Sequence, residues 1–269
     1  MGFHHHIYLF RSQKQAKYYT ETLSESVTLD MVSIPGGTFL MGSPETEIDR
    51  YDDESPQHKV TIQPFFMSKY LVTQTQWQAI MGKNPSRFKG KNLPVERVSW
   101  DDAMAFCKKL SKKTGNTYRL PSESEWEYAC RAGTTTPFYF GETITTDLAN
   151  YRGIDDKEYK WSGSYGSGPK GIYREKTTDV GSFPSNAFGL CDMHGNLWEW
   201  VADKYHESYN GSPSDNSVWE KGGEDYRVLR GGSWVSYPDV ARAASRGRGN
   251  PDYRGDSVGF RVVHRVART

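Results

Sequence analysis

The chain has 269 residues, a formal net charge of +1 and 25% charged residues, so it is not a polyelectrolyte and is long enough for one large domain or two small ones. No apolar run approaches the roughly 18 residues of a membrane span and no secretory signal is visible, so we expect a cytoplasmic protein without a membrane partner. Its three cysteines have no paired spacing, which argues against a disulfide framework and fits a reducing compartment.

The first residues predict an arm outside the folded domain. His4, His5 and His6 are either native sequence or the remainder of an added tag, and we expect no metal there. Residues 11–26 are polar and predict a helical or loose segment. We therefore assign 1–26 to an N-terminal arm and 27–269 to one domain.

The domain opens with two extended segments. Alternating apolar residues on both sides of Pro35-Gly36-Gly37, within 29–43, predict a hairpin that turns at this tripeptide. Residues 58–72 are also rich in β-branched and aromatic side chains and predict further strands.

Two helices with recognisable ends come next. Thr73 and Gln76 predict an N-terminal cap for a helix that stops at Gly82. Ser99 opens a longer helix with acids at its start and lysines at its end, the arrangement that the helix dipole favours. The apolar face expected for this second helix consists of Trp100, Ala103, Met104, Cys107 and Leu110.

A third helix and a long irregular region complete the fold. Ser122 and Glu125 predict a capping box for a helix that ends at Gly133. Residues 134–226 are mostly Gly, Asp, Ser, Thr and aromatics, which predict long ordered loops with a few short strands. The fold class expected is α+β with little regular secondary structure.

The C-terminal part of the chain is basic. Residues 227–269 hold nine arginines, three aspartates and no lysine. A basic tail could bind nucleic acid, but these arginines stand singly among Gly, Pro and Asp. Arginine makes planar, multi-donor hydrogen bonds that suit fixing loops. We therefore expect structural arginines and no nucleic-acid partner.

Residues 234–258 combine a regular frame with assorted gap residues. The frame consists of RVLRGGSW, which holds Arg230, of GFRVV, which holds Arg261, and of Pro238, Arg242, Arg246, Arg248, Pro251 and Arg254 between them. We expect the frame side chains to be buried or hydrogen-bonded. The gap residues are mostly small residues and tyrosines, which give contact area and adaptable hydrogen bonds, as in antibody paratopes. We therefore expect the gap residues on one contiguous exposed face, with Tyr237 and Tyr253 as anchors. The gap residues are Val235, Ser236, Tyr237, Asp239, Val240, Ala241, Ser245, Gly247, Gly249, Tyr253, Gly255, Asp256 and Ser257.

Five ordered sequence blocks point to a family. IPGGTFLMGS, VTQTQWQAI, RLPSESEWEYACRAG, NAFGLCDMHGNLWEW and RVLRGGSW…GFRVV closely resemble the formylglycine-generating-enzyme, or sulfatase-modifying-factor (FGE-sulfatase), domain. The resemblance covers about residues 29–263. It implies a single domain with a C-type-lectin-like core.

The catalytic chemistry of that family depends on two cysteines shortly after the block matching GGSW, which bind copper(I). The corresponding stretch here, SWVSYPDVARAAS, has no cysteine, so we expect no copper and no catalytic residue of that type. Cys107, Cys130 and Cys191 are expected to be small buried hydrophobes. The alternative is a catalytic family member that performs oxidative cysteine or sulfur chemistry with other residues.

The resemblance also implies structural calcium. At the block CDMHGNLWEW, Asp192 and Glu199 would supply carboxylates and Gly195 and Leu197 main-chain carbonyls. In the alternative interpretation these two acids bond loop amides, and His194 is expected to be structural.

A second family calcium site would begin at Asn150 and Tyr151. The residues after them, GIDDKEYKWSGSYGSGPKG, depart from the family pattern. The resemblance therefore predicts this second calcium site more weakly than the first.

A subset of the family resembles the variable proteins of diversity-generating retroelements, in which a reverse transcriptase randomises adenines in a C-terminal cassette. Asparagine codons mutated in this way cannot become Lys, Glu, Gln, Met or Trp. None of these five residues occurs between Val235 and Val258. We therefore expect a non-enzymatic protein that binds an unidentified protein or small molecule through a diversified surface.

Overall fold

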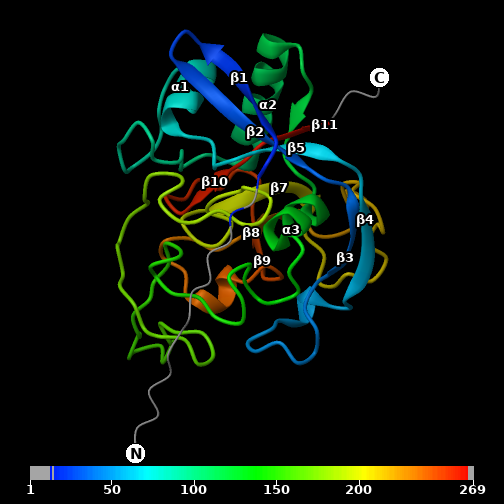
Figure 1. The fold of residues 1–269 in the computed structure, drawn as a ribbon, viewed down its shortest axis with the longest axis vertical. Helices are drawn as coiled ribbons and strands as arrows, with labels where there is room; N and C mark the ends of the chain where they lie inside the picture. The colour runs from blue at the N-terminus through cyan, green and yellow to red at the C-terminus, as the bar shows by residue number, and fades with distance from the viewer. Residues whose placement is uncertain (1–12, 14, 266–269) are drawn as a thin grey trace, which may run out of the picture.

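The computed structural model describes residues 13 and 15–265, and three β-sheets form the framework of this part (Figure 1). The first has the strand order β1 (Tyr18–Ser24), β2 (Val27–Ile34), β5 (Phe65–Ser68), β11 (Val263–Arg265) and β6 (Tyr118–Arg119). The second has the order β10 (Val258–Phe260), β7 (Trp198–Lys204), β8 (Arg227–Arg230) and β9 (Arg246–Gly249). The third pairs β3 (Gly37–Met41) with β4 (His58–Ile62).

The predicted N-terminal arm, 1–26, extends too far into the chain. Residues 18–24 are neither helical nor loose, because β1 pairs antiparallel with β2 at the edge of the first sheet. Leu23 of this strand is fully buried. The folded domain therefore begins by Tyr18, and the histidines of the N-terminus lie outside the described residues.

The strands around Pro35-Gly36-Gly37 do not pair with each other, so the predicted hairpin is wrong. β2 pairs with β5 and β3 with β4, antiparallel and in one continuous register. Pro35 and Pro64 lie opposite each other between these pairings, where two residues without N–H groups interrupt the ladder. One long ribbon thus leaves the first sheet for the third at this point, and its turn lies within 42–57.

The three helices begin and end close to the predicted positions. Capping boxes start all of them: α1 (Gln74–Met81), α2 (Trp100–Thr114) and α3 (Glu123–Arg131). On α2 the predicted Met104 is exposed, and Phe106 packs in the core instead. The buried face of α2 differs from the predicted face because it is determined by the strands that the helix contacts, β1 and β6.

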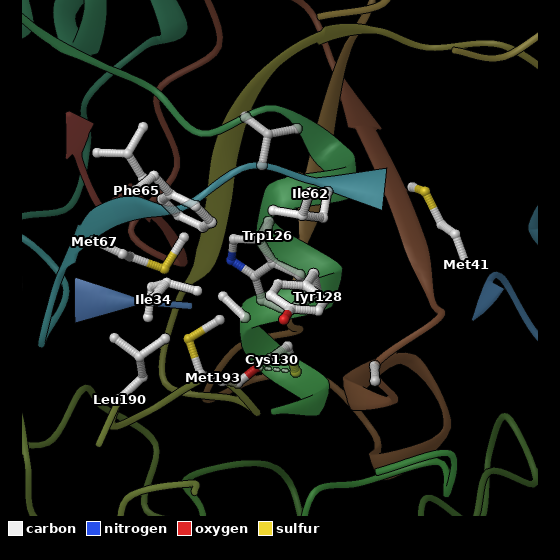
Figure 2. Close-up of a cluster of buried hydrophobic side chains, with 14 of the residues drawn as sticks. Ile34, Met41, Ile62, Phe65, Met67, Trp126, Tyr128, Cys130, Leu190 and Met193 are labelled. Carbon is white, nitrogen blue, oxygen red and sulfur yellow. Dashed lines mark hydrogen bonds between the residues drawn. The ribbon is translucent and has the colours of Figure 1, made fainter. Parts of the chain in front are cut away.

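Helix α3 lies at the centre of the molecule, with every residue buried (Figure 1). Trp126 and Cys130 of this helix pack with Phe65 and Met67 of β5 and with Met193 (Figure 2). Burying such large side chains stabilises the fold by roughly 1.5–3 kcal/mol each. The same helix carries Glu123 and Glu127, whose carboxylates accept hydrogen bonds from Arg246 and Arg230.

Long ordered loops occupy most of 134–226, as predicted, with β7 as the strand within it. Two short 3-10 helices, η1 (Asp52–Glu54) and η2 (Pro238–Ala241), lie on the loops that follow β3 and β8. No helix among the described residues is both long and apolar enough for a membrane crossing.

Candidate ligand-binding surface

Four frame arginines are buried and fix the loops between β8 and β11. They are Arg230, Arg242, Arg246 and Arg261. Each makes a salt bridge to a buried carboxylate. The prediction of structural arginines is confirmed for these four.

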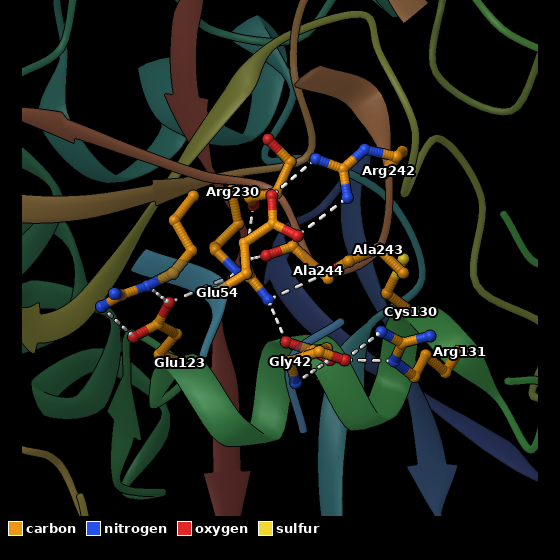
Figure 3. Close-up of polar contacts among 12 residues, drawn as sticks. Gly42, Glu54, Glu123, Cys130, Arg131, Arg230, Arg242, Ala243 and Ala244 are labelled. Atoms are coloured by element: carbon orange, nitrogen blue, oxygen red, sulfur yellow. Dashed lines mark hydrogen bonds and ion pairs between the residues drawn. The ribbon is translucent and has the colours of Figure 1, made fainter. Parts of the chain in front are cut away.

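Arg242 has an acceptor for every N–H group it carries, and Figure 3 shows its pairing with Glu54. Its two terminal nitrogens bind both carboxylate oxygens of Glu54, at 2.8 and 2.5 Å, and Glu47 at 2.6 Å. The remaining N–H groups donate to the carbonyls of Asp49 and Asp239, at 2.8 and 2.7 Å. Arg242 therefore fastens η2 to the loop 42–57.

Arg230 and Arg246 fasten the chain between η2 and β9 to helix α3. Arg230 and Glu123 are labelled in Figure 3. Arg230 donates to the main-chain carbonyls of 243–245 and to Glu127. Arg246 forms a two-point pair with Glu123, at 2.7 and 3.1 Å, and donates to the carbonyls of Asp53 and His206. A planar guanidinium suits several fixed acceptors at once, so these side chains hold the backbone between η2 and β9.

Two other frame arginines lie at the surface and are hydrogen-bonded there, which still agrees with the prediction of a buried or hydrogen-bonded frame. Arg248 pairs with Glu224 at 2.9 Å and Arg254 with Asp102 at 2.8 Å, and about half of each arginine side chain is exposed. Exposed pairs of this kind stabilise a fold by roughly 0–1 kcal/mol. They are therefore weak supports of the loop.

The gap residues divide into exposed and buried groups. Val235 and Tyr253 are exposed, at 39% and 49%. Half-buried residues at the surface are Asp239, Val240, Gly247, Gly249, Gly255, Asp256 and Ser257. Ser236, Tyr237, Ala241 and Ser245 are buried, so the expectation of one exposed face is wrong for them.

Each buried gap residue has a packing role. Ser236 accepts a hydrogen bond from the main-chain N–H of Ser233 and closes the turn after β8. Ala241 is fully buried in a cluster with Phe138 and Tyr165. Tyr237 lies beneath Trp161, and Ser245 is enclosed between η2 and β9.

The two gap glycines of β9 lie close to tryptophan side chains of β7. A Cβ on Gly249 would lie 2.7 Å from the Trp200 indole, and one on Gly247 would lie 3.2 Å from that of Trp198. Real Cβ atoms do not approach a ring at the first distance without displacing it. Gly249 therefore cannot display a varied side chain without displacing Trp200, and a side chain at Gly247 requires Trp198 to move by a few tenths of an ångström.

An aromatic loop that the sequence analysis did not single out covers η2. Trp161 meets the Tyr237 ring edge-on, with centroids 4.8 Å apart, and Tyr159 lies 5.8 Å from Trp161. The Arg152 guanidinium lies over both Tyr237 and Tyr173, at 5.0 and 5.2 Å. Trp161 and Tyr159 are 57% and 63% exposed.

A second set of contacts continues this surface toward β10. Tyr173 stacks on Trp234, and Phe88 meets the same indole edge-on. The Trp234 N–H donates to the carbonyl of Asp256, whose carboxylate pairs with Arg87 at 2.6 Å. Trp234 therefore connects the aromatic side chains around η2 with Asp256.

The third side of the surface is the loop 42–57. Tyr51 donates to the Asp239 carboxylate at 3.1 Å, and burial together with that acid raises the pKa of Tyr51 to about 12. We use the name display surface for the face formed by Tyr51, Arg87, Arg152, Tyr159, Trp161, Tyr173, Val235, Asp239 and Asp256.

Exposed large apolar side chains gather on the segments of this surface. Of the eleven such side chains among the described residues, seven lie on 42–57, 152–173 and 233–240. A signal in the sequence was available: Tyr159 and Trp161 are aromatic residues in a polar, aperiodic stretch that cannot bury them by forming a helix or strand. The seven are Ile48, Tyr51, Ile154, Tyr159, Trp161, Ile172 and Val235.

The residues implied for the first calcium site do not fit an ion shared by two carboxylates. Both oxygens of Glu199 accept from Arg261, at 2.7 and 2.8 Å, and one also accepts from the Trp126 indole. Asp192 accepts from the Gly181 amide through one oxygen, while the other is buried without a partner. Burial raises the pKa of Asp192 to about 6. The carbonyl of Gly195 accepts from the Leu197 amide.

The second implied calcium site offers mainly neutral groups. The side-chain oxygen of Asn150 is buried without a partner, and its amide nitrogen donates to Lys176 and Asn196. The Tyr151 side chain is buried, and its hydroxyl donates to Ile144. Among the described residues no group of three or more His, Cys, Asp or Glu could hold a metal.

The cysteines and His194 are buried as predicted. Burial raises the pKa of the Cys107 thiol to about 12 and that of Cys191 to about 11, and raises the pKa of Cys130 as well. Burial lowers the pKa of His194 to about 3, and both ring nitrogens are hydrogen-bonded, to the Ala241 carbonyl and the Tyr139 amide. None of these groups is prepared to act as a nucleophile at neutral pH.

Comparison with known proteins extends these observations. Residues 18–266 match the family model described as the sulfatase-modifying factor enzyme 1-like domain. The formylglycine-generating enzyme of Mus musculus is 29% identical over 87% of this chain and 74% of the enzyme.

Two solved structures are similar to this protein over almost the whole chain. PvdO from Pseudomonas aeruginosa is similar with a TM-score of 0.80 and 35% identity, over 95% of this chain and 100% of that one. Treponema denticola variable protein 1 is similar with a TM-score of 0.77 and 28% identity, over 93% and 99%. The predicted α+β, C-type-lectin-like fold with long ordered loops is confirmed.

Proposed function

Because the chain belongs to the sulfatase-modifying factor enzyme 1-like domain family, we propose that it is a non-enzymatic member that binds a ligand on its display surface. Fold alone does not decide between catalysis and binding. The proposal therefore depends on the surface itself.

The observation that carries the proposal is the concentration of exposed apolar side chains around η2. Contiguous apolar patches on a folded protein mark interaction sites. Here buried arginine–carboxylate pairs hold the backbone of 42–57 and 239–246, so the exposed side chains on these two segments contribute little to folding. Such a division suits a surface whose residues change while the fold is kept.

We further propose that diversification by a retroelement acts on six gap positions. The similarity to the Treponema denticola variable protein supports this, as does the amino-acid content of 235–257. The buried gap residues are excluded by their packing, and the three gap glycines are excluded by the close contacts that a Cβ would make, at 3.2 Å for Gly247, 2.7 Å for Gly249 and 2.5 Å for Gly255. The six positions are Val235, Asp239, Val240, Tyr253, Asp256 and Ser257.

The catalytic alternative rests on the similarity to the mouse enzyme. Oxidation of a substrate cysteine through copper(I) requires thiolates that reach the solvent. The thiols of this chain are buried and have raised pKa values, so another chemical group would have to take their place. Free buried thiols also fit the cytoplasm as the proposed location.

Two matched libraries test the proposal. A surface library randomises the six positions, and a control library randomises Ser236, Tyr237, Ala241, Ser245, Gly247 and Gly249. After display on yeast, protease resistance should persist in most surface-library clones and be lost in most control-library clones. Equal losses in both libraries would refute a surface that varies independently of folding.

The diversification itself has a separate test in the gene neighbourhood. A reverse-transcriptase gene and a near-identical template repeat should accompany the gene. The template repeat should have adenines in the codons that correspond to the six positions. Their absence would remove the retroelement while leaving a fixed binding protein.

A further inference from the structure

We propose that the display surface binds a folded protein, and that Tyr159 and Trp161 form a constant anchor for it whichever residues occupy the six variable positions. The inference rests on the proposed function and adds the class of partner. It also assigns the main contact to residues outside 234–258.

The shape of the surface favours a protein over a small molecule. Small-molecule sites are concave and enclose most of the ligand. Two hollows of the molecule lie elsewhere, one around Asp203 and Tyr209 and the other around His206 and Glu224. No residue of the display surface lines either hollow, and the exposed side chains of Tyr159, Trp161 and Val235 suit contact with the surface of a partner.

The anchor is exposed but held in place. The main-chain groups of Trp161 and Asp156 exchange hydrogen bonds of 2.9 and 3.1 Å, and the Asp156 carboxylate pairs with Arg152 at 2.9 Å. Arg152 in turn lies over Tyr237, against which the indole of Trp161 stands. A side chain fixed in this way loses little conformational freedom on binding.

Residue type also distinguishes the anchor from the variable positions. Aromatic side chains that present large rigid areas dominate the energetics of protein interfaces. The variable positions hold smaller or charged residues, such as Val235, Asp239 and Asp256, with Tyr253 as their one aromatic residue. Retroelement mutation cannot produce tryptophan, so a tryptophan contact must come from outside the cassette.

Charge orients the partner across this anchor. The loop that reaches Asp239 exposes the acids Glu45, Asp49 and Asp52. The loop that reaches Asp256 exposes five bases, Lys83, Arg87, Lys89, Lys91 and Arg97. An aromatic centre with a charged rim is the usual anatomy of a protein interface, and rim charges steer association. The partner should present basic groups to the first loop and acidic groups to the second.

The experiment selects binders and then removes the anchor. The surface library, in the full chain, is selected separately against hen egg lysozyme and serum albumin. Each selected clone then receives Trp161→Ala, Tyr159→Ala or Trp161→Phe, with Met104→Ala as the exposed control on α2. Trp161→Ala should weaken binding at least tenfold in clones for both targets, Tyr159→Ala should weaken it severalfold, and Trp161→Phe should retain most of the affinity. Met104→Ala should have no effect.

Circular dichroism first confirms that the variants are folded, and Tyr159→Ala serves if Trp161→Ala is not. Clones whose affinity ignores both substitutions overturn the anchor and leave the proposed function intact. Equal success in selection against immobilised fluorescein overturns the protein partner. A wild-type dimer seen by light scattering, and lost in Trp161→Ala, makes a second copy the occupant and also overturns it. A folded library without any binder overturns the proposed function itself.

Discussion

Replacing Arg242 by alanine tests whether the frame carries the stability of the variable segment. The substitution leaves the carboxylates of Glu54 and Glu47, both almost fully buried, without their cation. It also removes the donors to the carbonyls of Asp49 and Asp239. Breaking a buried pair on one side costs about 3–5 kcal/mol, a large part of the roughly 5–15 kcal/mol that stabilises a domain.

The pH dependence of this loss follows from the carboxylates. Burial already raises the pKa of Glu47 although Arg242 lowers it, so removal of the guanidinium should raise that pKa further. The folded variant then binds more protons than its unfolded chain above the ordinary pKa of glutamate, so its stability falls as the pH rises through that window. The deficit of Arg242→Ala should therefore be larger at pH 8 than at pH 5.

Urea denaturation followed by tryptophan fluorescence at both pH values measures this. Val235→Ala and Tyr253→Ala are the matched surface controls and should each change the free energy of unfolding by about 0.5 kcal/mol or less. Arg248→Ala, an exposed frame residue, should cost about 0–1 kcal/mol. An Arg242→Ala loss below about 1 kcal/mol, with larger losses in the surface controls, would show that frame and surface are reversed.

Four further outcomes are expected. Burial and the nearby Glu123 charge raise the pKa of Asp203 to about 7, so the native state binds the extra proton and stability should fall as pH rises from about 4 to 7; Asp203→Asn should flatten that part of the urea-midpoint profile, and an unchanged slope would contradict it. Because Arg261 donates to both carboxylate oxygens of Glu199, the melting temperature should be equal in EDTA and in millimolar calcium. A rise of the melting temperature with calcium that Asp192→Ala abolishes would show that the ion displaces the arginine. Copper and a CxPxR peptide should yield no aldehyde by mass spectrometry, since no thiol follows Trp234; turnover would restore the catalytic alternative. Gly249→Ala should cost roughly 1–3 kcal/mol in the same urea assay through its contact with Trp200, and a neutral result would return that position to the variable set.

The sequence by itself determined the features that depend on near neighbours. Each helix cap joins residues three positions apart, such as Ser122 and Glu125, so the local pattern contains the whole interaction. The structural role of the frame arginines could also be predicted from the sequence, because arginines that stand singly among Gly and Pro do not form a continuous charged patch. The burial of Cys107 and Cys130 followed from their apolar helical neighbours.

Only the tertiary structure decided features that join distant parts of the chain. Arg242 meets Glu54 across 188 positions, and Tyr237 is buried by Trp161 from a loop without periodicity. The register that pairs β2 with β5, and not with β3, depends on which sheet can bury each strand. Exposure is a property of what else occupies the neighbouring space, so gap residues of one chemical type became core at Ala241 and surface at Val235.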